Sequence, residues 1–213
     1  MHDFRNRSDA GRRLAAHLAP WSAPDVIVLG LPRGGVPVAA EVAAALGAPL
    51  DIIVVRKLGI PFRPEVAMGA IGEGGVRVLD EALIERAGVT LAEVDAVETR
   101  ERATLDSRVA RFRAGGARLD LIGRTAIIVD DGIATGATAT AACRVARQLG
   151  AARVIVAAPV GGPDAAQRVD GADEVVCLLQ PLGFQAVGAY YRDFAQTSDD
   201  EVARLLASRA RGG

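Results

Sequence analysis

Two adjacent carboxylates stand where an apolar stretch of the chain gives way to a loop of small residues. The stretch AIIVDDGIATGAT covers residues 126–138, with Asp130 and Asp131 directly after its apolar part. Carboxylates accept hydrogen bonds from sugar hydroxyls and bind hydrated magnesium. The loop leads into a predicted helix start, where free backbone N–H groups and a partial positive charge favour a phosphate. The combination predicts a site for a phosphorylated sugar.

The composition of the loop suits that ligand. Gly132 and Gly136 let the backbone curl and approach closely, and Thr135 and Thr138 add hydroxyl donors. The string is neither G-x-x-x-x-G-K-[ST] nor G-x-G-x-x-G, so the P-loop and dinucleotide-binding interpretations lose support. The alternative is an ordinary strand–loop–helix connection in which an aspartate only caps a helix.

The elements that would position this loop alternate between strands and helices. Continuous apolar runs predict buried parallel strands, and the stretches between them predict helices with proline near the start or glycine after the end. The predicted strands are residues 25–30, 51–56, 125–130, 153–159 and 173–179, and the predicted helices include 36–46, 90–113, 136–149, 163–170 and one that begins at 198–201. This order predicts one doubly wound α/β domain over residues 1–213, with ligands beyond the carboxyl ends of its strands.

Residues 59–79 interrupt the alternation. They contain two prolines and five glycines, with short strand-like pieces on either side of residues 73–75. We predict a β-hairpin beside a flexible loop over residues 59–75, and solvent exposure for its two acids, Glu65 and Glu73.

The stretch at 126–138 resembles the motif with which type I phosphoribosyltransferases bind phosphoribosyl diphosphate (PRPP). The shared features are an apolar strand, two acids, a small loop and Thr-Gly-x-Thr. The resemblance implies that Asp130 and Asp131 hold the ribose hydroxyls and take part in binding Mg²⁺, directly or through water. It also implies that a loop wraps the 5′-phosphate, consisting of Gly132, Ile133, Ala134, Thr135, Gly136, Ala137 and Thr138.

Two further loops agree with the resemblance. LPRGGVP (31–37) is similar to the family's pyrophosphate loop, in which Arg33, Gly34 and Gly35 would meet the diphosphate and the Pro32–Arg33 peptide is expected to be cis. VVRKLG (54–59) would place Arg56 and Lys57 near the same group. Without the resemblance, residues 31–37 would be interpreted as an ordinary turn between a strand and a helix, and Arg56 and Lys57 as a basic pair in solvent. The implied catalytic residues are Arg33, Lys57, Asp130 and Asp131.

The C-terminal residues 181–213 would form a small hood over the base, followed by a terminal helix. GFQAVG resembles the base-stacking segment of hypoxanthine-guanine phosphoribosyltransferases, with one residue inserted. Phe184 is therefore a base-stacking candidate, with Tyr190 and Tyr191 as rivals, and simple packing of the hood is the alternative. The implied fold is a Rossmann-like parallel sheet flanked by helices, with an inserted loop or hairpin and this hood.

The expected function is transfer of a phosphoribosyl group from PRPP to a nitrogenous, purine-like base, with Mg²⁺ as cofactor. The alternatives are a protein of the same fold that senses PRPP or a nucleotide, and a hydrolase of phosphoribosyl compounds. Charge argues against nucleic acid and membrane surfaces as partners, since 25 basic residues balance 26 acidic ones. Two cysteines, no secretory signal and no long apolar run favour a cytoplasmic protein, for which we expect a homodimer.

Overall fold

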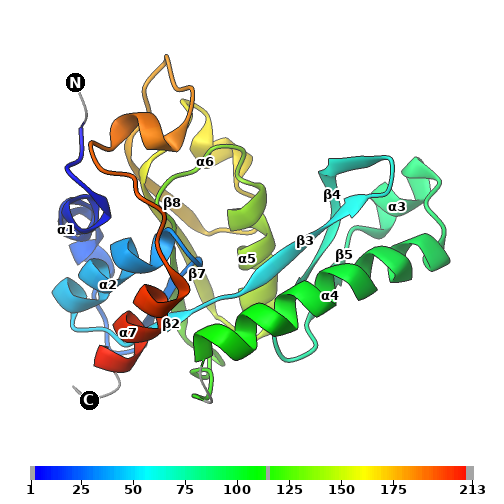
Figure 1. Cartoon of the computed structure of the whole chain (residues 1–213), viewed down its shortest axis with the longest axis horizontal. Coiled ribbons are helices and arrows are strands. Elements are labelled where there is room, and N and C mark those ends of the chain that lie inside the picture. Colours follow the sequence, from blue (N-terminus) through cyan, green and yellow to red (C-terminus); the bar gives the residue numbers. More distant parts are fainter. Residues whose placement is uncertain (1–2, 114–115, 210–213) are drawn as a thin grey trace.

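A computed structural model describes residues 3–113 and 116–209, and in this part the strands form two sheets (Figure 1). The larger sheet has the order β2-β1-β6-β7-β8, and every neighbouring pair in it is parallel. Its strands are β1 (Val26–Gly30), β2 (Leu50–Ile52), β6 (Thr125–Val129), β7 (Arg153–Val160) and β8 (Glu174–Leu179). The predicted parallel α/β fold is confirmed.

Both faces of this sheet are covered by helices, as the continuous apolar runs predict. Val28 and Val129 pack on the side of α1 (Arg7–Leu18) and α2 (Gly35–Leu46), whereas Leu29 and Ile128 pack on the side of α5 (Ala137–Gln148). Figure 1 shows α1 and α2 on one side of the strands and α5 on the other. The helices that follow β1 and β6 therefore lie on opposite faces.

A second layer of structure, which we call the arm, comprises residues 55–113. Its antiparallel strands β3 (Val55–Ile60), β4 (Arg63–Gly72) and β5 (Arg77–Leu79) are followed by α3 (Glu81–Ala87) and α4 (Leu91–Arg113). Figure 1 shows α4 running along these strands, with the arm projecting to one side of the larger sheet. Thr90 and Glu93 exchange hydrogen bonds at the start of α4 and so form a capping box.

The arm corrects three predictions. The strand predicted at 51–56 is wrong, because β2 ends at Ile52 and Val55 already belongs to β3 in the other sheet. Most of the predicted loop at 59–75 is instead paired strand, because β3 and β4 form an antiparallel hairpin whose register shifts around Gly59. The predicted hairpin around residues 73–75 is confirmed, because β4 pairs with β5, and Glu65 is exposed as expected.

Glu73 is buried rather than exposed, because it joins a charged cluster where the arm meets the larger sheet. Arg113, at the end of α4, donates two hydrogen bonds of 2.6 Å to the Glu73 carboxylate and one of 2.9 Å to Asp51 of β2. The two acids are 7% and 5% exposed. Arg113 thus supplies charge-assisted hydrogen bonds to both buried carboxylates, and two backbone N–H groups donate further bonds to Asp51.

The C-terminal part returns to the larger sheet. Its elements are the short α6 (Ala165–Arg168), narrower than the predicted 163–170, the 3₁₀ helix η2 (Val187–Tyr190) and α7 (Asp199–Arg209). Another 3₁₀ helix, η1 (Ala19–Trp21), follows α1. Ser198 caps α7 by accepting the Glu201 N–H at 3.1 Å, and Leu205 and Leu206 pack against both the sheet body and the arm. Residues 1–2, 114–115 and 210–213 of the predicted domain and hood lie outside the described residues.

No helix in the described ranges combines the length and apolar character that crossing a bilayer requires.

Candidate active site

The candidate site lies where β1 and β6 run side by side. Gly30, the last residue of β1, pairs with Val129, the last residue of β6. From these central strands the chain continues to β2 on one side and to β7 on the other, so the order of strands reverses here. In open α/β sheets, ligands bind in the crevice at such a point. The two loops that leave it, residues 31–35 and 130–136, carry most of the predicted site.

These two loops are in direct contact, and two glycines permit it. A Cβ atom on Gly34 would overlap the carboxylate of Asp131, and one on Gly35 would overlap the carbonyl oxygen of Val129. The Leu31 N–H also donates to the Val129 carbonyl at 2.9 Å. The Pro32–Arg33 peptide is cis, as the resemblance led us to expect. The predicted diphosphate loop and the predicted ribose acids therefore form one continuous surface.

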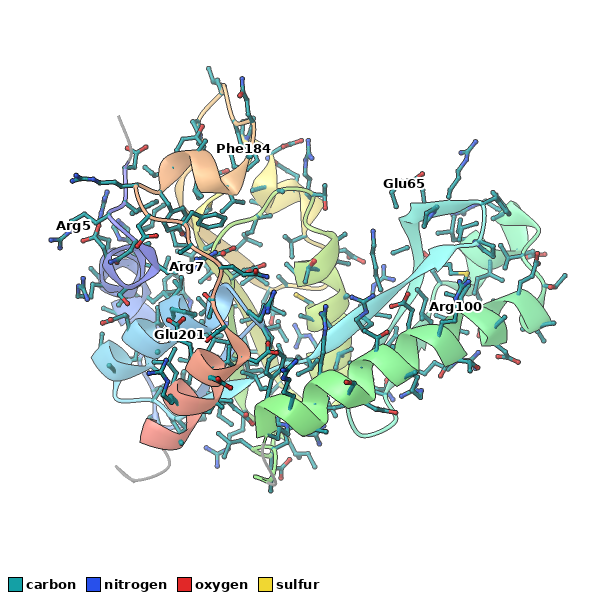
Figure 2. All side chains as sticks on the ribbon, viewed as in Figure 1. Arg5, Arg7, Glu65, Arg100, Phe184 and Glu201 are labelled. Carbon is teal, nitrogen blue, oxygen red and sulfur yellow. The ribbon has the colours of Figure 1, made fainter. Side chains whose placement is uncertain are left out.

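Arg7 holds the carboxylate of Asp131. Its Nε donates to Asp131 Oδ2 at 2.9 Å, and a terminal nitrogen lies 2.8 Å from the same oxygen. The guanidinium also donates to the Ala195 carbonyl at 2.7 Å and lies 4.0 Å from the centre of the Phe194 ring. Figure 2 shows Arg7 pointing from α1 towards the site. Sequence analysis missed this residue, because no local pattern marks a partner 124 positions away.

Asp130 has a different environment from its neighbour. Its Oδ1 accepts the Asp131 N–H at 2.9 Å, and no described basic side chain forms an ion pair with it. Burial, followed by the negative charge of Asp131, raises the pKa of Asp130 to about 8. Burial also raises the pKa of Asp131, and the adjacent Arg7 guanidinium opposes that change. Asp131 therefore has a permanent counter-charge, whereas Asp130 can take a proton or a cation.

The loop after the acids presents backbone donors. Gly136 caps α5 with a φ of 74°, and a Cβ there would lie 2.6 Å from the Arg168 carbonyl oxygen, so glycine is needed. The N–H groups of Ala134, Thr135 and Gly136 have no acceptor among the described residues. These donors at a helix N-terminus can bind a phosphate.

The predicted hood covers this loop, but its aromatic residues differ in role. The Val187 side chain closes over Gly132, where a Cβ would come within 2.5 Å of it. Phe184 and Tyr190 are half-buried and stack with ring centres 5.9 Å apart. Tyr191 is 2% exposed, and its hydroxyl donates to the Asp131 carbonyl at 2.6 Å. Tyr191 is thus a packing residue, which leaves Phe184 and Tyr190 as base-stacking candidates.

The predicted basic residues do not all gather at the acids. Arg33 turns towards α7 and lies 3.5 Å from Asp199. Arg56 and Lys57 are within β3 of the arm; Arg56 pairs with Glu101 of α4 at 2.5 Å, and Lys57 is exposed. Both therefore lie in the arm and not at the end of the second parallel strand.

A magnesium ion would find a partial site here. Among the described residues, no three His, Cys, Asp or Glu side chains gather as a metal cage. Mg²⁺ commonly keeps several waters and uses one or two carboxylates together with substrate phosphates. Asp130 and Asp131 fit that mode, in which the ion arrives with its phosphorylated ligand.

The fold and these loops define a doubly wound α/β protein with two acids and free backbone N–H groups at one edge of its parallel sheet. The chain belongs to the phosphoribosyl transferase domain family, whose pattern it matches over residues 2–192. It is similar to two Mycobacterium tuberculosis proteins named "Putative phosphoribosyl transferase" (MT0597 in strain CDC 1551 and Rv0571c in strain H37Rv), each 58% identical over 207 residues. That similarity covers 97% of this chain but 47% of each relative, so the chain spans about half of their length.

A solved structure resembles the whole chain. The crystal structure of TT1426 from Thermus thermophilus has a TM-score of 0.91 and 44% sequence identity, and the match covers 98% of this chain and 99% of that one. The arm and the hood therefore belong to an arrangement that this Thermus protein shares.

Proposed function

We propose that this protein transfers the 5-phosphoribosyl group of PRPP to a nitrogen of a base and releases diphosphate. The bond between C1′ and the diphosphate oxygen breaks, and a bond from C1′ to a nitrogen of the base forms. The proton that this nitrogen loses passes to water or to a nearby proton acceptor. Such a reaction develops positive charge at C1′ and negative charge on the leaving diphosphate. Positioning and charge stabilisation can then supply most of the rate.

The contact between the two loops carries this proposal. The acids after β6 suit ribose hydroxyls, the donors at the start of α5 suit a 5′-phosphate, and the glycines after Arg33 lie against the acids. A ligand with a sugar between two phosphate-bearing ends matches that order of groups. Family membership supports the same substrate class.

Each of the residues described above would have a separate role in this reaction. Arg7 keeps Asp131 charged and oriented, so that this carboxylate can accept from a ribose hydroxyl. Asp130 would release its proton as the ligand and its cation arrive. Mg²⁺, when bound, would neutralise charge on the diphosphate. Phe184 and Tyr190 would provide an aromatic surface for the base.

The test measures diphosphate release from PRPP with a panel of purine and pyrimidine bases, with and without Mg²⁺. We expect release that depends on one class of base and on Mg²⁺. Equal release without any base would instead identify a hydrolase, and tight PRPP binding without release would identify a sensor. No binding of PRPP at all would contradict the proposal. The homodimer and the cytoplasmic location stay predictions.

A further inference from the structure

An aspartate in the segment after β7 carries an oxygen that lacks a hydrogen-bond donor. Asp164 Oδ1 is shielded from solvent, and no residue that the structure describes donates to it. The other oxygen, Oδ2, lies 2.7 Å from Arg168 Nε, in an ion pair whose side chains are about half exposed. Shielded polar atoms of native proteins nearly always have a partner, because leaving one unpaired costs free energy. Oδ1 therefore has unused capacity to accept a hydrogen bond.

Asp164 lies beside the loop that follows the two acids. The Gly162 N–H donates to the carbonyl of Ile133 in that loop, at 3.2 Å. Arg168, which pairs with Asp164, also donates to the carbonyl of Ala134 at 3.4 Å. Two contacts thus tie the segment of Asp164 to the loop that would bind the 5′-phosphate.

The hood reaches the same place from another side. A Cβ atom on Gly162 would lie 3.3 Å from Asp164 Oδ1 and 3.9 Å from Phe184 Cδ1, so the carboxylate and the ring both border this glycine. Figure 2 shows Phe184 in the hood, where its ring stacks on Tyr190 with 7° between the two planes. Glycine permits a close approach of a ligand. A flat base that lay on Phe184 would bring one of its edges towards Asp164.

A carboxylate discriminates between the edges of different bases. The hydrogen bond from Arg168 lowers the pKa of Asp164, so the side chain is ionised at neutral pH and only accepts hydrogen bonds. Oδ2 has room for a second bond, so the two oxygens together can accept two parallel donors. Guanine presents such a pair, an amino group beside a ring N–H. Hypoxanthine presents the ring N–H alone, and adenine presents an acceptor nitrogen beside its amino group.

We propose that Asp164 selects the base, by accepting two N–H hydrogen bonds from a base of the guanine type that lies on Phe184. The inference rests on the proposed function, in which the hood holds the base. The hood opens slightly to admit the base, because Oδ1 is shielded before the ligand binds. A base with an acceptor at either donor position leaves the carboxylate without its partner, and sites of this kind reject such a base strongly.

The experiment titrates the whole chain calorimetrically, in the presence of Mg²⁺, with the monophosphates of guanosine, inosine and adenosine (GMP, IMP and AMP) and with ribose 5-phosphate. The nucleotides differ only in the base, and ribose 5-phosphate has none. Two variants are compared with the unmodified protein. Asp164→Asn keeps the size of the side chain and replaces one acceptor with a donor. Asp170→Asn is the matched control, because Asp170 lies just beyond α6, is 72% exposed and pairs with Arg144. Thermal melts check that both variants fold.

We expect the unmodified protein to bind GMP about tenfold or more tightly than IMP, because IMP lacks the amino group and with it one charge-assisted hydrogen bond. Asp164→Asn should bind GMP about tenfold or more weakly, and AMP at least as tightly as GMP, since an amide matches a donor beside an acceptor. Asp170→Asn should change each affinity by less than about twofold, because an exposed ion pair contributes little. Ribose 5-phosphate should bind all three proteins alike.

Three results would overturn the inference. The first is equal affinity of the unmodified protein for GMP and IMP, and the second is a preference for GMP that survives in Asp164→Asn. The third is an equal loss of GMP and ribose 5-phosphate binding in Asp164→Asn, because Asp164 would then act only through the phosphate loop.

Diphosphate release from PRPP separates this inference from the proposed function. Release that is equally efficient with guanine and hypoxanthine leaves the proposed function standing and overturns selection by Asp164. A preference for GMP that depends on Asp164, without any release from PRPP, supports selection by Asp164 and contradicts the proposed transfer reaction.

Discussion

The edge of the parallel sheet and the end of the arm both collect charge, but they do so by different means. At the sheet edge, backbone groups and two short carboxylates are fixed by close packing of Gly34 against Asp131 and of Gly35 against β6. At the end of the arm, arginines of α4 reach their partners through long, partly exposed side chains. The first arrangement is rigid and specific in shape, and the second can follow a ligand's charge.

This difference separates a closely packed region from one whose charged side chains can adjust. The sugar and its 5′-phosphate would meet groups that need not move. The predictions below alter one side of this comparison at a time.

The largest effect is expected from breaking the joint between the two regions. Arg113→Met leaves Asp51 and Glu73 buried without their common cation, so the free energy of unfolding should fall by about 3–5 kcal/mol. Denaturant unfolding measures the change. Arg102→Met is the control, because the Arg102–Glu98 pair on the same helix is partly exposed and is worth about 0.5 kcal/mol or less. An equal fall in the free energy of unfolding of the two variants would show that the buried Arg113 cluster contributes no more than an exposed ion pair.

The second-largest effect is expected where the two loops pack together at the edge of the parallel sheet. Gly34→Ala places a methyl group on the Asp131 carboxylate, so the loops must separate, and PRPP affinity should fall about 100-fold, or roughly 2.8 kcal/mol. Gly183→Ala is the control, since a Cβ at Gly183 meets no atom within 4 Å. Binding is measured by calorimetric titration. Unchanged affinity in Gly34→Ala would mean that contact between the loops is irrelevant to the ligand.

The two neighbouring acids should respond oppositely to substitution by asparagine, because only Asp131 has an arginine partner. Because the pKa of Asp130 is raised from 3.8 to about 8, the folded state keeps a proton that the unfolded chain has lost. The free energy of unfolding therefore declines as pH rises between these values, and this contribution is fully present only at lower pH. At about pH 8, Asp130→Asn should be more stable than the unmodified protein by at least about 1.4 kcal/mol, the equivalent of one pKa unit, with little difference near pH 4.

Asp131→Asn is the matched comparison for that experiment. At about pH 8 it removes the counter-charge of Arg7, whose side chain is 12% exposed, so this variant should be less stable than the unmodified protein. Thermal melts across pH report both changes. A gain in stability for both variants would show that Arg7 does not hold Asp131 in its charged form.

Much of the sheet edge could be predicted because its signals are local. The apolar runs, the two acids after β6 and the glycines after Arg33 can each be recognised from a few neighbouring residues of the sequence. Family resemblance added the cis peptide at Pro32–Arg33. Short-range patterns of this kind fix strand ends, helix starts and close turns.

The remaining features depend on contacts between distant segments. The apolar run at 51–56 contains no breaker, so nothing local shows that the chain changes sheets after Ile52. The sequence around Glu73 predicts an exposed acid in a turn. Glu73 is buried because Arg113, at the end of α4, donates hydrogen bonds to it. Arg7 and Tyr191 reach Asp131 from opposite ends of the chain. Periodicity and motifs carry no information on such partners.

The central claim is that the acid pair binds the ribose of PRPP. It is tested most directly by titrating PRPP with Mg²⁺ into the unmodified protein, Asp130→Asn and Asp131→Asn. Each substitution keeps the size of the side chain and weakens one charge-assisted acceptor, so affinity should fall about tenfold or more per residue. Affinity that is unchanged in both variants, with a loss of thermal stability only, would make the aspartates mere structural residues and contradict the account.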